Sequence, residues 1–257
     1  EALRRIETGS EPVDGTEPLP PAAALGRILT VPVRARAMAP PFDNAAMDSY
    51  AVATGALSGD GPWRLSVTGR VAVGRGAAPL PSGLTAAQIF TGAPIPPGAD
   101  AVVMQEHASR EGDTIRIDAR PRPGLNVRRA GEDMHAGQIV LGAGCRLGAR
   151  EIAVAAAGGA DAVHVRRRLR VALLVTGDEV QPAGAGRTAS GIRDINTPML
   201  SAAIAGPAVE LVCLAHGADD RDGLTRQLGD LAAGADLIVT TGGISAGEED
   251  HVKPALA

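Results

Sequence analysis

Acidic, hydroxyl and glycine residues follow each of three apolar runs in the C-terminal third of the sequence. The runs are residues 169–175, 209–214 and 237–239, and the polar groups after them are Thr176 to Glu179, Asp219 with Asp220, and residues 240–250. If these runs are parallel strands, their carboxyl ends meet at one edge of a sheet, where backbone amides can hold an anion and carboxylates can hold Mg²⁺. An acidic residue ahead of a helix can instead be an N-cap. Agreement among three strand ends favours a binding site.

Two short motifs suggest competing chemistry. Residues 243–247 (GISAG) fit the nucleophile elbow of serine hydrolases. However, only Asp250 and His251 follow Ser245 in the required order, and they are too close in sequence to come from later strands. Residues 184–189 fit a loose dinucleotide fingerprint, but no strand directly precedes them and Pro182 intervenes. Neither motif carries a function.

The elements that must position the polar groups follow from the apolar pattern. The three apolar runs alternate with helical patterns near residues 198–204 and 224–231, which predicts a parallel sheet covered on both faces. Short alternating runs broken by Gly and Pro predict a small all-β domain at residues 49–131. Residues 1–30 predict a helix, a Pro-rich loop and a second helix at residues 22–25, after Pro20 and Pro21.

The composition is that of an ordinary globular protein with about two domains, since 45% of the 257 residues are apolar. The net charge of −4 and the absence of a basic face argue against nucleic acid as a partner. Residues 166–168 are three arginines, interpreted as a solvated domain junction rather than a ligand site.

Two distant cysteines indicate neither a metal site nor a disulfide framework. The longest apolar stretch, residues 152–165, contains Asp161 and is shorter than the roughly 20 residues of a membrane helix, so no membrane association and a cytoplasmic location are expected.

Several segments, taken in order, resemble the molybdopterin molybdenumtransferases, the family of MoeA and the gephyrin E domain. The segments are 40–52 (PPFDNAAMDSYAV), 90–94 (FTGAP), 98–106 (GADAVVMQE), 126–133 (NVRRAGED), 176–179 (TGDE), 194–196 (DIN) and 242–245 (GGIS). Together they cover essentially the whole chain, and many ordered motifs are far more specific than any single one.

The resemblance implies an α/β multidomain fold. Residues 1–48 and 132–166 would form an elongated, discontinuous α+β domain, and residues 49–131 a small β domain inserted into it. Residues 167–257 would form a three-layer α/β molybdopterin-binding domain with a parallel-type sheet. The chain would be C-terminally incomplete, with the rest of that domain and a C-terminal β-barrel missing.

The resemblance also implies a reaction. The family takes adenylated molybdopterin and molybdate, cleaves the adenylate with release of AMP, and leaves molybdenum on the dithiolene. Mg²⁺ would neutralise and polarise the pyrophosphate. The family acts as a homodimer in which the β domain of one subunit faces the α/β domain of the other, and a molybdopterin adenylyltransferase is a possible partner.

The residues implied at the site fall into two groups. Those expected to be catalytic are Asp48, Thr91, Asp133, Glu179, Asp220 and Asp250, with Glu179 and Asp250 as the metal ligands. Those expected to bind the pterin are Asp194, Asn196, Gly242, Gly243 and Ser245. Because Asp219 and Asp220 are adjacent, either can be the family's acid. Asp48 and Thr91 could instead be turn residues, and Asp133 a helix cap.

Two other functions remain open on the same fold. The molybdopterin adenylyltransferases share the Gly-Gly-Ser loop, although the long first half of the chain favours the molybdenumtransferases. The second function is that of a scaffold, as in the gephyrin branch. The acids retained at every expected position argue against this role. One departure from the family pattern is Ser49, where glycine is usual. If that position requires a positive φ, serine costs about 1 kcal/mol or more.

Overall fold

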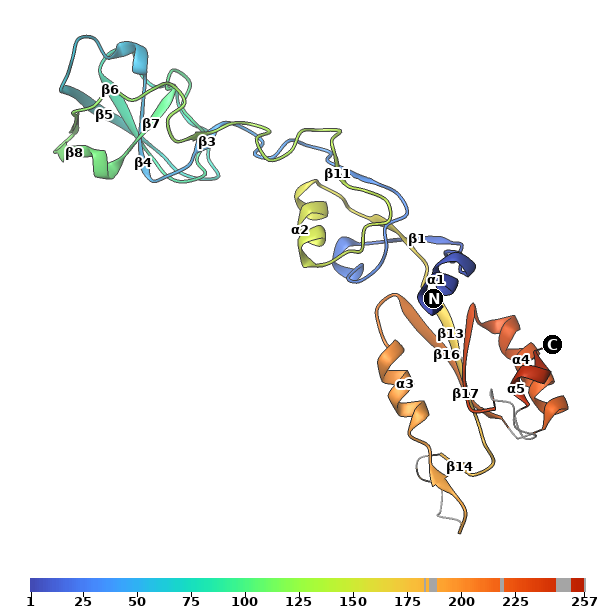
Figure 1. The fold of residues 1–257 in the computed structure, drawn as a ribbon. Helices are drawn as coiled ribbons and strands as arrows, with labels where there is room; N and C mark the ends of the chain where they lie inside the picture. Colours follow the sequence, from blue (N-terminus) through green and yellow to red (C-terminus); the bar gives the residue numbers. More distant parts are fainter. Residues whose placement is uncertain (183, 185–188, 218–219, 244–250, 257) are drawn as a thin grey trace. The chain divides into compact units, whose positions relative to one another are not determined.

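The chain forms two compact units, each assembled from separate stretches of sequence (Figure 1). The structure is a computed structural model that describes residues 1–182, 184, 189–217, 220–243 and 251–256. One unit comprises Glu1–Pro32, Leu141–Ala153 and Asp161–Ala257, and the other comprises Val33–Val140 and Val154–Ala160. The division into three domains made from the sequence stays a prediction.

A three-stranded parallel sheet forms the core of the last third of the chain. Its strands are β13 (Leu169–Thr176), β16 (Val209–Gly217) and β17 (Leu237–Thr241), in the order β16-β13-β17. β13 pairs in parallel with both neighbours, and every residue from Val171 to Thr176 is buried. A continuous apolar run is typical of a parallel strand covered on both faces, and this prediction is confirmed for β13.

Helices cover both faces of this sheet, which confirms the predicted α/β class (Figure 1). They are α3 (Asn196–Ile204) on one side, and α4 (Arg221–Gly234) with α5 (Val252–Ala255) on the other. Leu224, Leu228 and Leu231 of α4 pack against Ala172 and Leu174. Each buried leucine contributes roughly 1.5–3 kcal/mol relative to an exposed one, so this stripe holds α4 on the sheet.

Asp236 joins the amino ends of two strands. Its carboxylate accepts from the guanidinium of Arg167, at 2.5 and 2.9 Å, and from the backbone amide of Arg170 at 2.9 Å. The bidentate ion pair with Arg167, followed by the hydrogen bonds from Arg170, holds the pKa of Asp236 well below its usual range. Because Asp236 directly precedes β17 and Arg170 lies in β13, these bonds fix the start of one strand beside the other.

The amino-terminal part of the chain contributes one helix and one strand. Leu3 and Ile6 of α1 (Ala2–Gly9) are exposed to solvent. β1 (Thr16–Leu19) pairs antiparallel with β12 (Val163–Arg166), so residues more than 140 positions apart share one ribbon.

The helix predicted at residues 22–25 is wrong in type and length. The structure has a single 3₁₀ turn, η1 (Pro21–Ala23), at this place. Gly26 then adopts a φ of 74° and donates its amide to the carbonyl of Leu147, at 2.6 Å. Glycine adopts this left-handed conformation readily, and the chain leaves the helical region after one turn.

The remaining connecting elements are short. They are β2 (Val33–Arg34) with β11 (Ile139–Leu141), β3 (Asn44–Ala45) with β10 (Val127–Arg128), β14 (Val180–Gln181) with β15 (Ile192–Arg193), and α2 (Ala149–Ala157). None of the helices in the described ranges is long and apolar enough to cross a membrane. The cytoplasmic location stays a prediction.

A six-stranded sheet dominates the second unit, in the order β7-β4-β6-β5-β9-β8. The strands are β4 (Ser49–Val52), β5 (Trp63–Val71), β6 (Thr85–Ile89), β7 (Ala101–Met104), β8 (Ala108–Glu111) and β9 (Thr114–Ile117), with 3₁₀ turns η2 (Thr54–Ala56) and η3 (Gln105–His107). All neighbours are antiparallel except β5 and β6. Short strands are present throughout residues 49–117, as the alternating runs predicted.

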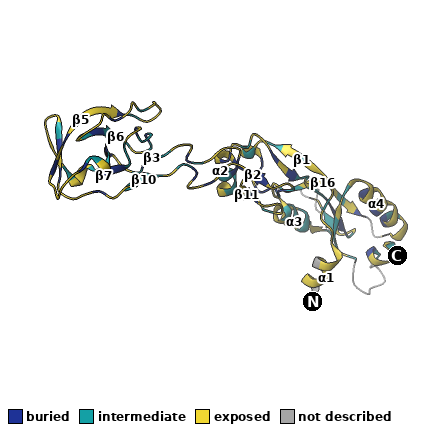
Figure 2. Cartoon of the chain, turned by 90° about the horizontal axis from the view of Figure 1, so that it is seen from above, coloured by how far each residue is buried: buried dark blue, intermediate teal, exposed yellow. Residues whose placement is uncertain are grey.

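Both faces of this sheet are packed. Tyr50 and Trp63 belong to a buried cluster on one face, whereas Ala51, Ile89 and Val102 belong to a cluster on the other. Successive residues of β4 thus point to opposite cores, as the two-residue period of a strand requires. Figure 2 shows buried residues along β5, β6 and β7. A core built largely of Ala, Val, Leu and Ile matches an aromatic content of only 2%.

Ser49 lies in this sheet without the positive φ that its place in the family pattern could have required. It is the first residue of β4, and Asn126 is the one non-glycine residue with positive φ in the part of the chain that the structure describes. Ser49 is 4% exposed, and its hydroxyl has no hydrogen-bond partner among the described residues. A buried hydroxyl left unpaired is unfavourable.

Replacing Ser49 by alanine should therefore raise the free energy of unfolding by about 1 kcal/mol, because the unpaired hydroxyl is removed and the strand conformation is kept. Ser49→Gly is the matched comparison and should gain less, since glycine weakens a strand interior by about 0.5–1 kcal/mol. Urea denaturation of both variants checks this. A destabilised Ser49→Ala variant would show that the hydroxyl is bonded in solution.

Candidate active site

Asp48 and Thr91 form a hydrogen-bonded pair where β4 begins and β6 ends. Ser49 of β4 pairs with Ile89 of β6, so the residues just outside these strands adjoin. Oδ1 of Asp48 accepts from the backbone amide and from the hydroxyl of Thr91, each at 2.8 Å. The amide bond, followed by the hydroxyl bond, lowers the pKa of Asp48 below its ordinary value. Both residues are exposed, so this ionised carboxylate is accessible to a ligand.

Asp133 belongs to a group of fixed charges nearby. Arg128 Nη2 lies 2.6 Å from Asp133 Oδ1, and this pairing raises the pKa of Arg128. Arg129 Nη1 lies 2.5 Å from Asp43 Oδ2, whose other oxygen accepts from the amide of Ala130 at 2.8 Å. That amide bond, with help from Arg129, lowers the pKa of Asp43 despite some desolvation. The motif of residues 126–133 therefore supplies two guanidinium groups that the sequence interpretation left without a role.

The short strand β3 connects these two groups. Ala45 of β3 pairs with Val127 of β10, and its carbonyl accepts from the amide of Gly92 at 2.8 Å. The turn that carries Thr91 and the strand that carries Arg128 consequently lie on either side of β3. The structure thus gathers Asp48, Thr91 and Asp133 around one strand, and their catalytic roles stay predictions.

Removing the Thr91 hydroxyl should raise the pKa of Asp48 toward its ordinary value, because one of the two hydrogen bonds to the carboxylate is lost. A depressed pKa means that the bonds favour folding above the pKa of the unfolded chain, about 3.9, and that this contribution disappears as the pH falls through the folded pKa. Titration of the Asp48 carboxyl carbon by NMR in Thr91→Ala measures the change. Thr91→Ser is the control and should titrate as the wild type does; equal titration of all three proteins would contradict the assignment.

Glu179 lies just beyond β13, at the carboxyl end of the parallel sheet. Its side chain folds back over Gly177, since a Cβ at that glycine would lie 2.8 Å from Glu179 Oε2. Gly177 has a φ of 125°, a conformation that L side chains rarely adopt. Glu179 is exposed, and its carbonyl accepts from the amide of Ile192 at 2.8 Å. The carboxylate is therefore available at the strand end where the sequence predicted it.

The start of α3 is hydrogen-bonded to two strand ends of the same sheet. Asp194 Oδ2 lies 2.8 Å from His216 Nε2, near the end of β16. Asn196 Nδ2 lies 3.5 Å from the hydroxyl of Thr241, which ends β17. His216 is a residue that the sequence interpretation missed, because the apolar run was taken to end at residue 214, whereas β16 continues to Gly217. A strand three residues longer places this histidine among the strand-end groups.

Gly242 and Gly243 pack against the end of β13. A Cβ at Gly242 would lie 2.6 Å from the Thr176 hydroxyl and 2.9 Å from its carbonyl, and a Cβ at Gly243 would lie 2.9 Å from Val252. Both glycines have positive φ, of 84° and 58°. Packing within the domain thus explains why both positions are glycine, and their contact with the pterin stays a prediction.

Asp220 is the N-cap of α4. Its Oδ1 accepts from the backbone amide of Gly223 at 2.7 Å, which pairs one of the free amides of the first helical turn. The residue is exposed at the carboxyl end of the sheet, so capping leaves it accessible. Three predicted positions, Asp219, Ser245 and Asp250, lie outside the described residues.

The capping role makes a specific prediction for Asp220. Asp220→Ala should lower the free energy of unfolding by about 1 kcal/mol, whereas Asp220→Asn should change it by only a few tenths, because asparagine caps as well as aspartate. Urea denaturation distinguishes the two. Equal stabilities of the alanine and asparagine variants would show that the cap does not contribute.

The predicted magnesium site was tested against the donors present. Across the described ranges, no group of three His, Cys, Asp or Glu side chains converges as a metal site would require. Mg²⁺ is commonly held by one or two carboxylates together with substrate phosphates and water, so a complete protein cage is not needed. The exposed carboxylate of Glu179 at the strand end fits such a site as one oxygen donor.

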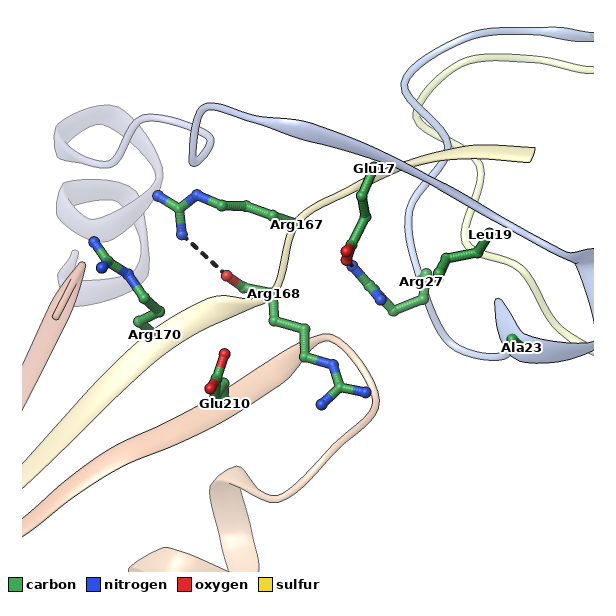
Figure 3. A pocket seen from close by; sticks show the side chains of 8 residues that line it. All are labelled: Glu17, Leu19, Ala23, Arg27, Arg167, Arg168, Arg170 and Glu210. Carbon is green, nitrogen blue, oxygen red and sulfur yellow. Dashed lines mark hydrogen bonds and ion pairs between the residues drawn. The ribbon is translucent and has the colours of Figure 1, made fainter. Parts of the chain in front are cut away.

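A cavity of about 420 Å³ lies at the opposite, amino end of the sheet (Figure 3). Its lining residues are Glu17, Leu19, Ala23, Arg27, Arg167, Arg168, Arg170 and Glu210. Most of its cations are already paired. Arg27 bonds to Glu17 and the Arg166 carbonyl, and Arg167 bonds to Asp236. Figure 3 also shows the bond from Arg167 to the carbonyl of Arg168. These arginines join segments of one compact unit, and the interpretation of residues 166–168 as a domain junction stays a prediction.

Comparison with known proteins identifies the family. Residues 1–159 match the family described as "MoeA N-terminal region (domain I and II)", and residues 172–257 match the "Probable molybdopterin binding domain". Molybdopterin molybdenumtransferase 2 of Mycobacterium tuberculosis H37Rv is 36% identical over 241 residues, which are 93% of this chain. The molybdopterin molybdenumtransferase of Nostoc sp. PCC 7120 is 36% identical over 91% of it. A crystal structure of the molybdopterin biosynthesis MoeA protein of Pyrococcus horikoshii OT3 superimposes with a TM-score of 0.85 at 29% identity, over 94% of this chain.

Motif order, fold and these similarities agree, and the chain belongs to the molybdopterin molybdenumtransferase (MoeA) family. The chain spans 60% of the length of the Mycobacterium tuberculosis protein, 55% of the Nostoc protein and 65% of the Pyrococcus chain.

Proposed function

We propose that the full-length protein inserts molybdenum into molybdopterin, with adenylated molybdopterin and molybdate as substrates. Water breaks the phosphoanhydride bond of the adenylate and AMP leaves. The two dithiolene thiols condense with molybdate, which gives up one oxygen as water. The water consumed by the first step is thus balanced by the water released in the second.

The convergence of polar side chains at the carboxyl edge of the parallel sheet supports this proposal most strongly. Glu179 and Asp220 follow β13 and β16, and hydrogen bonds fix Asp194 and Asn196 against the ends of β16 and β17. Ligands of open α/β sheets bind outside this edge. Relatives named for the proposed reaction match over more than 90% of the chain.

Glu179 and Asp250 are proposed to hold Mg²⁺ against the pyrophosphate. When bound there, the cation would supply Lewis-acid polarisation of the phosphoryl oxygens. Asn196, Gly242, Gly243 and Ser245 would surround the pterin, with Asp194 beneath them. Asp220 would contribute a further negative charge at the same edge, and Asp219 is the alternative for this role.

The residues of the second unit are proposed to complete the site in a homodimer. Asp48, held ionised by Thr91, can only accept hydrogen bonds, which suits a water molecule or an N–H group of the ligand. Asp133, which is paired with Arg128, would lie beside Asp48 and face the α/β domain of the other subunit. A molybdopterin adenylyltransferase would supply the substrate.

The test is molybdate-dependent AMP release from adenylated molybdopterin by the full-length protein with Mg²⁺. Glu179→Gln should reduce the rate about 100-fold or more, because a donor to the cation is lost. Glu210→Gln is the matched control, since Glu210 is also an exposed carboxylate of this sheet but lies at its opposite end. Its rate should stay within about twofold, because nothing in the proposed chemistry touches it.

Other outcomes would contradict the proposal in different ways. Formation of adenylated molybdopterin from ATP would make the protein an adenylyltransferase, and the absence of both reactions in the intact dimer would leave a scaffold role. Asp220→Asn separates the two assignments of the neighbouring acid. A stable variant with normal AMP release would restrict Asp220 to capping and point to Asp219.

A further inference from the structure

His216 faces the same side of the sheet as the start of α3. Its register partner in β13 is Val175, which in turn pairs with Thr241 of β17. Partners across a sheet share one face, and the preceding β13 residue, Leu174, packs on the opposite face against α4. His216 and Thr241 are therefore the two strand-end side chains beneath the residues that open α3.

The carboxylate of Asp194 is already fully engaged. Its side chain is only 3% exposed; Oδ1 accepts from the amide of Thr197 at 2.9 Å, and Oδ2 lies 2.8 Å from His216 Nε2. Burial acts to raise the pKa of Asp194, but the bonds from Thr197 and then His216 outweigh it, so the pKa is lowered. An ionised carboxylate only accepts hydrogen bonds, which places the proton of this contact on Nε2.

The imidazole of His216 uses one of its two ring nitrogens for the contact with Asp194. Its side chain is 36% exposed, and Nδ1 has no hydrogen-bond partner among the described residues. In a neutral imidazole that carries its proton on Nε2, Nδ1 is an acceptor. The bond to the buried aspartate thus fixes the orientation of the ring, and the neutral imidazole presents an acceptor at Nδ1.

We propose that His216 determines specificity at the molybdopterin site: its Nδ1 accepts a hydrogen bond from an N–H group of the pterin ring, and Asp194 is the positioning residue that holds the imidazole for it. This rests on the proposed function and extends it. The sequence predicted that Asp194 itself binds the pterin. We assign this contact to His216 instead, because the carboxylate oxygens of Asp194 are buried and already accept hydrogen bonds.

The polarity of Nδ1 selects the pterin over the phosphate part of the ligand. A pterin edge carries amino and ring N–H donors, whereas phosphate oxygens at neutral pH are acceptors. An acceptor that faces another acceptor leaves both without a hydrogen bond, which is unfavourable. An imidazolium would instead donate through Nδ1 and favour phosphate, so the two ligand groups can be distinguished by experiment.

Two substitutions distinguish the role of Nε2 from the role of Nδ1. The amide of His216→Gln occupies the place of Nε2 and keeps the contact with Asp194, whereas the amide of His216→Asn occupies the place of Nδ1 and keeps an acceptor toward the ligand. Binding of 6-hydroxymethylpterin and of AMP to the full-length protein would be measured by fluorescence and calorimetry. His216→Gln should weaken pterin binding roughly five- to tenfold, as expected for one lost hydrogen bond. It should leave AMP binding unchanged, and His216→Asn should bind the pterin more tightly than His216→Gln.

Each alternative result overturns the proposal. Unchanged pterin affinity in His216→Gln would confine His216 to holding Asp194, and weakened AMP binding would assign Nδ1 to phosphate. Failure of the wild type to bind the pterin probe would also refute the contact. Molybdate-dependent AMP release is measured separately with adenylated molybdopterin, so a failed contact and a failed reaction can be told apart. If His216→Asn does not fold, the His216→Gln comparison decides alone.

Discussion

The parallel pairing of β13 with both of its neighbours is the constraint on which the candidate site depends. Because all three strands run in the same direction, their carboxyl ends meet, and the register sets Val175 between His216 and Thr241. Burial of β13 fixes this arrangement from within, and Asp236 fixes the opposite end through Arg167. Groups from β16, β17 and the start of α3 therefore share one edge, where Asp194 bonds to His216 and Asn196 bonds to Thr241.

Fixed hydrogen bonds to carboxylates are the feature common to both units. Asp48 is held by Thr91, Asp133 by Arg128, and Asp194 by Thr197 and His216. Each carboxylate is oriented by these donors. A carboxylate fixed in this way needs little reorganisation when it pairs with a cation or accepts a hydrogen bond from an N–H group.

Much of this architecture could be predicted from the sequence, because continuous apolar runs and helical spacing report the burial of whole elements. The strands around β13 and the leucine stripe of α4 were predicted for that reason. Single-residue geometry could not be predicted. The contact of His216 with Asp194 depends on where β16 ends, the bonds of Asp236 join residues far apart in sequence, and Ser49 proved to be an ordinary strand residue with an unpaired hydroxyl. Such facts depend on register and tertiary contact, which local pattern does not encode.

The central claim is that the ligand binds at the carboxyl edge of the β16-β13-β17 sheet. Hydrogen–deuterium exchange of the full-length protein, resolved to single amides and measured with and without adenylated molybdopterin, tests it most directly. We expect added protection at residues 176–179, 192–197 and 241–243, with the amino ends of the strands near Arg170, Glu210 and Asp236 unchanged. Protection confined to the amino ends, or to the arginine-lined cavity beside them, would show that the ligand does not bind at the carboxyl edge.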